Sequence, residues 1–174
     1  AWPSEEMRSA RPTRRSPLYA HLQAAGACFG EKLGWERPNW FADLARGEAP
    51  VDRYSYQRPG WWDQVRREHL ACRRAAVLID QSSFAKFILK GPDAARALNH
   101  IAAGNVDRPV GSLIYTQMLN ARGGIEADVT VARTAWDEFY IVTGTGFATH
   151  DFDWISRNLT GNCQLVDVTS GFAV

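Results

Sequence analysis

The stretch "MLNARGGIEADVTVAR", residues 118–133, predicts two β-strands joined by a tight turn. In the second strand, apolar and polar side chains alternate, which is typical of a strand with one buried face: Ile125, Ala127, Val129 and Val131 are interleaved with Glu126, Asp128 and Thr130. Asp128 is the unusual member, because aspartate is disfavoured inside strands. The pattern alone favours a solvated Asp128, and a carboxylate that faces a ligand is the alternative.

The sequence on either side of this hairpin predicts short strands and helices in mixed order. Glycine, proline and capping signals together with apolar spacing predict helices at 16–26, 61–77, 93–104 and 147–159, and strands at 84–90, 113–119, 125–133, 138–144 and 163–169. The segment from Gly34 to Gly60 is rich in aromatic residues and predicts an irregular but packed loop. The fold class is therefore α+β, with a mainly antiparallel sheet and packed helices.

Composition excludes several classes of function. The 174 residues are 45% hydrophobic and 22% charged, as in an ordinary globular domain, and the net charge of +1 argues against a nucleic-acid partner. No apolar run is long enough to span a membrane, and no histidines have metal-ligand spacing. Three scattered cysteines favour free thiols in a reducing compartment. The basic cluster in residues 1–15 predicts a solvated linker: Arg8, Arg11, Arg14 and Arg15.

Two further stretches bear on function and extent. "TGTGFATHDFDW" places Gly144 and Gly146 between a strand and a helix, but the dinucleotide fingerprint needs a third glycine where the chain has Thr149. A close backbone approach to a planar ligand is the better hypothesis for these glycines. The last residues, "CQLVDVTSGFAV", rise into an apolar strand and stop, so we expect the chain to be a truncated part of a longer domain.

The hairpin also carries a resemblance. "YTQMLNARGGIEADVTV" resembles the signature of the aminomethyltransferase family, the tetrahydrofolate-binding fold of the glycine-cleavage T-protein. Other segments agree with the family in the same order along residues 16–174: "SPLYAHLQAAGACF", "EHLACRRAAVLID", "FAKFILKG", "GNVDRP" and "YIVTGTGFATHDFDWI". Within the family, "GWERPNWF", "DQSSFAKF" and "GGIEAD" look like the C-terminal folate domain of dimethylglycine and sarcosine dehydrogenases.

The resemblance implies an organisation and an activity. Residues 1–15 would be the tail of a preceding domain, and residues 16–174 the N-terminal half of a tetrahydrofolate-binding domain. An FAD-bearing domain upstream would oxidise an N-methyl amine, and the folate domain would capture the one-carbon unit as methylene-tetrahydrofolate. This fragment alone would be inactive, and its partner would be the remainder of its own polypeptide. The location would be the cytoplasm of a bacterium or the mitochondrial matrix of a eukaryote.

The resemblance also implies a site. Asp128 aligns with the acidic residue at the folate amine nitrogens and would be catalytic. Tyr115 and Met118 would flank the pterin or its benzoyl extension, and the next strand would offer backbone and a small surface to the ring through Val142, Thr143 and Gly144. Two alternatives keep the fold: T-protein-like aminomethyl transfer or another folate-dependent demethylation, and a non-catalytic regulatory role. A globular domain without a small-molecule site is a further alternative.

Overall fold

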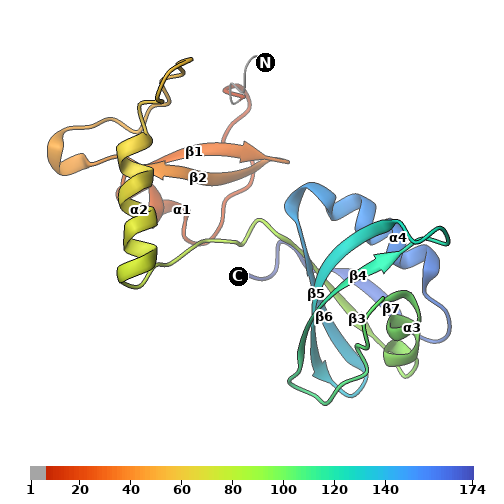
Figure 1. Cartoon of the computed structure of the whole chain (residues 1–174). Coiled ribbons are helices and arrows are strands. Elements are labelled where there is room, and N and C mark those ends of the chain that lie inside the picture. Colours follow the sequence, from red (N-terminus) through yellow and green to blue (C-terminus); the bar gives the residue numbers. More distant parts are fainter. Residues whose placement is uncertain (1–6) are drawn as a thin grey trace. The chain divides into compact units, whose positions relative to one another are not determined.

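A computed structural model of the chain describes residues 7–174. The chain forms two compact units, the first ending at Ser83 and the second spanning Phe84–Phe172, and each has its own hydrophobic core (Figure 1). Among the described residues, no helix has both the length and the apolar character needed to cross a membrane.

The first unit is built on a two-stranded antiparallel hairpin. Its elements in chain order are α1 (Tyr19–Ala24), β1 (Ala27–Lys32), β2 (Trp35–Phe41), a short 3-10 helix η1 (Leu44–Arg46) and α2 (Trp62–Arg74). The small core of this unit contains Cys28, Trp40 and Ala42, with Trp61 and Val65 packed against it. Burial raises the pKa of the Cys28 thiol to about 11, with a further contribution from Asp52. All three cysteines of the chain are free.

The prediction of an irregular loop beginning at Gly34 is wrong for its first residues, because Trp35–Phe41 forms β2. Pro38 lies opposite Phe29 at the point where the register with β1 shifts, so the strand contains an irregularity that interrupts its alternation. Trp35 and Trp40 are buried, as the prediction of a packed aromatic segment required, but the prediction is wrong for Tyr54 and Tyr56, which are exposed.

The prediction of a solvated linker is wrong for Arg11 and Arg14. The Arg11 guanidinium pairs with both carboxylate oxygens of the buried Glu36, at 2.5 and 2.9 Å. The backbone of Arg14 bonds to Gly34 and Glu36, and its guanidinium lies 4.4 Å from the centre of the Trp35 ring. These residues therefore belong to the packing of the first hairpin, whereas the assignment of residues 1–15 to a preceding domain stays a prediction.

The predicted ends of two helices in the first unit are also wrong. Helix α1 begins at Tyr19 rather than Ser16, because the Ser16 hydroxyl accepts a hydrogen bond from the Leu18 amide and donates one to Asp80 in a turn before the helix. Helix α2 ends at Arg74, since Ala75 already has extended backbone angles.

The second unit is a five-stranded sheet with two helices. Its elements are β3 (Ala85–Lys90), α3 (Ala94–Ile101), β4 (Leu113–Leu119), β5 (Ile125–Ala135), β6 (Glu138–Thr143), a 3-10 turn η2 (Thr145–Phe147), α4 (Ala148–Asn158) and β7 (Gln164–Asp167). The strands run in the order β4-β5-β6-β3-β7, and every neighbouring pair is antiparallel. The predicted α+β class is confirmed, and each predicted element of this unit forms with ends shifted by at most three residues.

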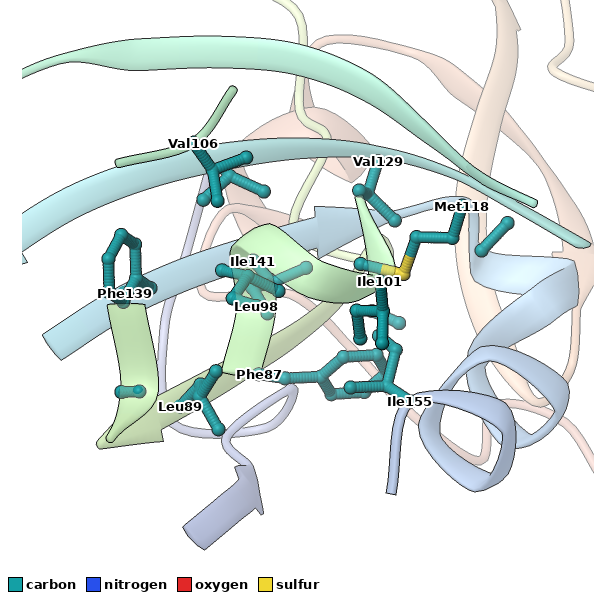
Figure 2. Close-up of a cluster of buried hydrophobic side chains, with 14 residues drawn as sticks. Phe87, Leu89, Leu98, Ile101, Val106, Met118, Val129, Phe139, Ile141 and Ile155 are labelled. Carbon is teal, nitrogen blue, oxygen red and sulfur yellow. The ribbon is translucent and has the colours of Figure 1, made fainter. Parts of the chain in front are cut away.

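Helices α3 and α4 cover one face of this sheet, which we call the inner face. Figure 2 shows side chains from the strands and from both helices meeting in one cluster. Its fully or nearly fully buried members include Phe87, Leu89, Leu98, Ile101, Met118, Val129, Val131, Phe139, Ile141 and Ile155. Each such side chain stabilises the fold by about 1.5–3 kcal/mol through its removal from water.

The predicted turn between β4 and β5 forms at residues 120–124. Gly123 has φ of +80°, a conformation that glycine adopts without strain. The Asn120 side-chain oxygen accepts hydrogen bonds from the amides of Arg122 and Gly124, which fixes the tight return of the chain. The register that follows places Asp128 directly opposite Gln117.

Candidate functional site

Asp128 projects from the face of the sheet opposite α3 and α4, which we call the outer face. Its neighbours Ala127 and Val129 are buried in the inner face, so the alternation of a strand turns Asp128 outward. Two side chains of β4 hold the carboxylate: the Tyr115 hydroxyl donates to Oδ2 at 2.7 Å, and the Gln117 amide donates to Oδ1 at 3.4 Å. The carboxylate is therefore oriented on an exposed surface, and its oxygens keep lone pairs for a further donor.

The bond between Tyr115 and Asp128 also fixes the state of the phenol. The hydrogen bond to the Asp128 carboxylate raises the pKa of Tyr115 above its ordinary value of 10. The phenol consequently stays protonated at neutral pH and remains a donor. Tyr115 is 66% exposed, so its ring surface is open beside the carboxylate that its hydroxyl holds.

The rest of the outer face is partly covered by the segment that follows β7. The ammonium of Lys86, which is fully buried, donates to the Phe172 carbonyl at 2.7 Å. The rings of Phe172 and Tyr140 meet edge to face at 5.8 Å. This segment covers the outer face over β3 and β6, whereas Tyr115 and Asp128 lie exposed on β4 and β5.

The structure brings Val142 and Gly144 towards this exposed part. Val142 is half-buried and pairs with Thr130, which shares the outward side of β5 with Asp128. Gly144 caps the turn η2, and a Cβ added there would lie 3.3 Å from the ring of Phe147. The glycine thus lets the exposed ring of Phe147 lie close to the end of β6.

Met118 and Thr143 point the other way, into the inner face. Met118 is fully buried in the hydrophobic core, because it is three residues from Tyr115 and a strand alternates with a period of two. Thr143 is also buried; its hydroxyl lies 3.4 Å from the Asp128 carbonyl oxygen and 2.5 Å from the Asp151 carboxylate, to which it donates. The structure therefore separates Met118 from the other residues predicted for the site and places Thr143 behind Asp128.

A second polar group lies beside the hairpin. The buried Asp151 carboxylate of α4 accepts from Thr143 and lies 2.9 Å from Nδ1 of His150, and Nε2 of His150 lies 3.5 Å from Glu126 on β5. Asn120 in the turn donates to the other oxygen of Glu126 at 2.8 Å. The hydrogen bond with Asp151 raises the pKa of His150 above its ordinary value of 6.5, and Glu126 adds to the shift.

Sequence reasoning missed Gln117, His150 and Asp151 as members of this region. Gln117 could have been found, because the alternation places it on the face of Tyr115 and a tight turn sets it opposite Asp128. His150 and Asp151 had no such signal, since their contacts with β5 and β6 depend on where α4 packs. Within residues 7–174, no group of three or more His, Cys, Asp and Glu side chains is placed to hold a metal ion.

This arrangement suits a ligand with nitrogen-bound hydrogens. An exposed, oriented carboxylate can accept hydrogen bonds from an amine and take up its proton. The open Tyr115 ring offers flat surface to a planar group beside that carboxylate.

Comparisons with known proteins agree with the resemblance. Residues 18–174 match the GCVT N-terminal domain family. The chain is 41% identical to 4-methylaminobutanoate oxidase (formaldehyde-forming) of Paenarthrobacter nicotinovorans, over 99% of this chain and 21% of that protein. It is 36% identical to human mitochondrial sarcosine dehydrogenase, over 95% of this chain and 22% of that protein. The chain thus spans about a fifth of the length of these relatives.

A solved structure extends the agreement to the fold. The crystal structure of the glycine cleavage system aminomethyltransferase T from Bartonella henselae matches with a TM-score of 0.72 and 27% sequence identity. The match covers 90% of this chain and 38% of that chain. The predicted aminomethyltransferase fold, present here in part, is confirmed.

Proposed function

The chain belongs to the GCVT N-terminal domain family, and from this premise we propose that it forms part of a tetrahydrofolate-binding domain in a dimethylglycine or sarcosine dehydrogenase-like enzyme. The domain would capture the one-carbon unit released by oxidative N-demethylation as methylene-tetrahydrofolate. The family and the dehydrogenase relatives support the class of reaction, and the residues around Asp128 support the location of the site on β4, β5 and β6.

The observation that carries the proposal is the Asp128 carboxylate, held by Tyr115 and Gln117 on an open surface. A free carboxylate at a strand surface rotates among several conformations, whereas this one is oriented by two neutral donors that leave its charge intact. Such a group can hold an amine nitrogen in one position, which is the main requirement for attack on a small electrophile.

When bound, tetrahydrofolate would supply the nucleophilic nitrogen, and the oxygen of the formaldehyde-level carbon would leave as water. Asp128 would hold that nitrogen by accepting its hydrogen bond and would take up its proton. The hydrogen bonds from Tyr115 and Gln117 hold the Asp128 carboxylate in one orientation towards that nitrogen. Val142 and Gly144 offer a small surface to the ring, while Thr143 supports the strand from behind and Met118 contributes through the core.

The remaining parts of the activity lie outside this chain. The proposed oxidant, FAD, is bound by a separate domain, and the second half of the folate domain completes the pocket. The proposed partner is thus the remainder of the same polypeptide, in keeping with relatives about five times as long. We place the protein in the cytoplasm of a bacterium or, in a eukaryote, in the mitochondrial matrix, in keeping with the human relative, which is named as mitochondrial.

The test compares the whole protein with its Asp128→Ala variant in an assay that measures methylene-tetrahydrofolate and free formaldehyde separately. We expect oxidation of the N-methyl amine to continue in the variant, while folate coupling falls by about 100-fold, as for loss of a proton-transferring group. Formaldehyde then replaces methylene-tetrahydrofolate as the product.

The matched control is Asp153→Ala, which removes an exposed carboxylate of α4 whose partner is Arg157. Coupling in this variant should equal that of the unmodified protein. Equal coupling in Asp128→Ala and Asp153→Ala would remove Asp128 from the reaction.

A second candidate function is aminomethyl transfer, which the likeness to the Bartonella henselae aminomethyltransferase favours. The two candidates differ in the need for an oxidant. Folate-dependent turnover by the whole protein without bound flavin would support aminomethyl transfer and exclude the coupled oxidation.

A further inference from the structure

The end of β5 that carries Asp128 extends past the strand beside it. In the part of the chain that the structure describes, the residue pairing between β5 and β6 begins at Thr130 opposite Val142 and continues away from the turn. From Ile125 to Val129, β5 is paired with β4 alone (Figure 1). Asp128 is therefore on a two-stranded ribbon, which is less constrained than the centre of a sheet.

Side chains provide links to this ribbon where the pairing stops. The Thr143 hydroxyl, at the end of β6, lies 3.4 Å from the Asp128 carbonyl oxygen. Two residues nearer the turn, Glu126 lies 3.5 Å from Nε2 of His150. Thr143 and His150 both contact the Asp151 carboxylate, at 2.5 Å and 2.9 Å respectively. Because the single hydroxyl proton of Thr143 is donated to Asp151, the contact from Glu126 through His150 to Asp151 is the link that connects this end of β5 to α4, two residues from Asp128.

The charges in this group favour a protonated His150. The Asp151 side chain is only 2% exposed, and a buried carboxylate is costly unless it has hydrogen bonds or a positive partner. His150 lies between this carboxylate on α4 and Glu126 on β5, while its own side chain is 51% exposed. An imidazolium donates from both ring nitrogens and so bonds both carboxylates at once, whereas a neutral imidazole has a single N–H.

We propose that His150 is a positioning residue which, as an imidazolium between Glu126 and Asp151, holds the ribbon of β5 against α4 and keeps Asp128 in place for folate. The inference rests on the proposed function, because it assigns His150 a part in the same site. His150 does not touch the ligand; it acts through Glu126 and Asp151.

The proposal predicts a direction of pH dependence. Asp151 and Glu126 raise the pKa of His150 above 6.5, so the link is present below that pH. It is lost as the pH rises through the raised pKa and the imidazolium loses its proton. Folate affinity is therefore expected to fall over this range, together with the protection of the β5 amides from exchange with solvent.

The experiment measures two quantities in the whole protein between pH 6 and pH 9: the dissociation constant of tetrahydrofolate, and hydrogen exchange of the amides in residues 125–130. Three variants are compared: His150→Gln, which cannot be charged; His150→Lys, which keeps a positive charge at all these pH values; and His100→Gln, an exposed histidine of α3, as the matched control. We expect His150→Gln to weaken folate binding about fivefold at pH 6.5 and to lower the protection of the amides in residues 125–130. The dissociation constant of folate in this variant should no longer change as the pH rises through the pKa of His150.

The other variants complete the test. His100→Gln should follow the unmodified protein at every pH, and His150→Lys should retain tight binding at pH 9. The inference is overturned if folate binding by His150→Gln depends on pH as it does in the unmodified protein. It is also overturned if His150→Lys binds folate at pH 9 as weakly as His150→Gln does. If the unmodified protein binds no folate at any pH, the proposed function is overturned and this inference with it. If the unmodified protein binds folate and His150→Gln binds it equally well, only this inference is overturned.

Discussion

The inner and outer faces of the five-stranded sheet are made by the same strands but carry different side chains. On β5, Ala127, Val129 and Val131 are at most 3% exposed and pack beneath α3 and α4. Between them, Asp128 faces outward and is held by hydrogen bonds from β4. One strand therefore supplies both a core and a candidate site, separated by a single residue step.

This difference teaches that stability and chemistry can be changed separately in this unit. Apolar burial on the inner face contributes most of the folding free energy, whereas exposed polar contacts contribute little to it. The outer face can instead maintain an oriented carboxylate that needs no burial. Substitutions on the inner face should accordingly lower the free energy of unfolding, and those on the outer face should weaken ligand binding. Substitutions in the polar group of Thr143, His150 and Asp151 should have an intermediate effect on the free energy of unfolding.

The largest effect is expected from Phe139→Ala on the inner face. Phe139 is fully buried, so its truncation leaves a cavity and lowers the free energy of unfolding by about 3–5 kcal/mol. Urea unfolding measures the change, with Leu113→Ala on the exposed side of β4 as the control. If the Phe139 variant does not fold, Ile141→Val reports the same property, with an expected loss of about 0.5–1.5 kcal/mol. Equal effects of the core and control substitutions would contradict the division between the faces.

An intermediate effect is expected from Asp151→Ala. The substitution leaves the buried Thr143 hydroxyl without its carboxylate acceptor and removes the partner of His150. The free energy of unfolding should fall by about 1–3 kcal/mol, the usual cost of an unsatisfied buried polar group. Asp153→Ala, on the exposed side of the same helix, should change it by about 0.5 kcal/mol or less. A stability loss confined to Asp153→Ala would show that the buried network does not support the sheet.

The smallest effect on stability, with the clearest effect on binding, is expected from Tyr115→Phe. The variant keeps the ring but loses the donor to Asp128, so the carboxylate is less well oriented. The urea midpoint should stay unchanged, while tetrahydrofolate affinity in the whole protein falls roughly fivefold. Tyr140→Phe is the control, because its ring lies on the outer face against Phe172. Equal affinities in the two variants would place the Tyr115 hydroxyl outside the site.

The sequence predicts the second unit well and the first unit poorly, for a physical reason. Regular alternation and a glycine-containing turn mark β4 and β5, and both strands form as expected. Strand β1 contains Gly30, and β2 contains Pro38 at an irregularity, so neither carries an alternating pattern. Their pairing is stabilised by tertiary contacts, such as the bonds from Arg11 to Glu36, which no local pattern contains.

The candidate site divides in a similar way. The outward direction of Asp128 and its closeness to Tyr115 follow from strand period and register, which are local properties. The same period places Met118 in the core, a consequence that the family resemblance did not supply. The link from Thr143 through Asp151 to His150 depends on how α4 packs against the sheet, and helix packing is a tertiary property that the sequence does not display.

The buried thiol of Cys28 has a practical consequence for the first unit. With its pKa raised to about 11 in a core that includes Trp40, Cys28 is almost entirely an unreactive thiol at neutral pH, whereas Cys72 is exposed on α2. Alkylating reagents should modify Cys72 first and reach Cys28 only when the hairpin separates from its core. The rate at which Cys28 is alkylated therefore measures how often the first unit opens.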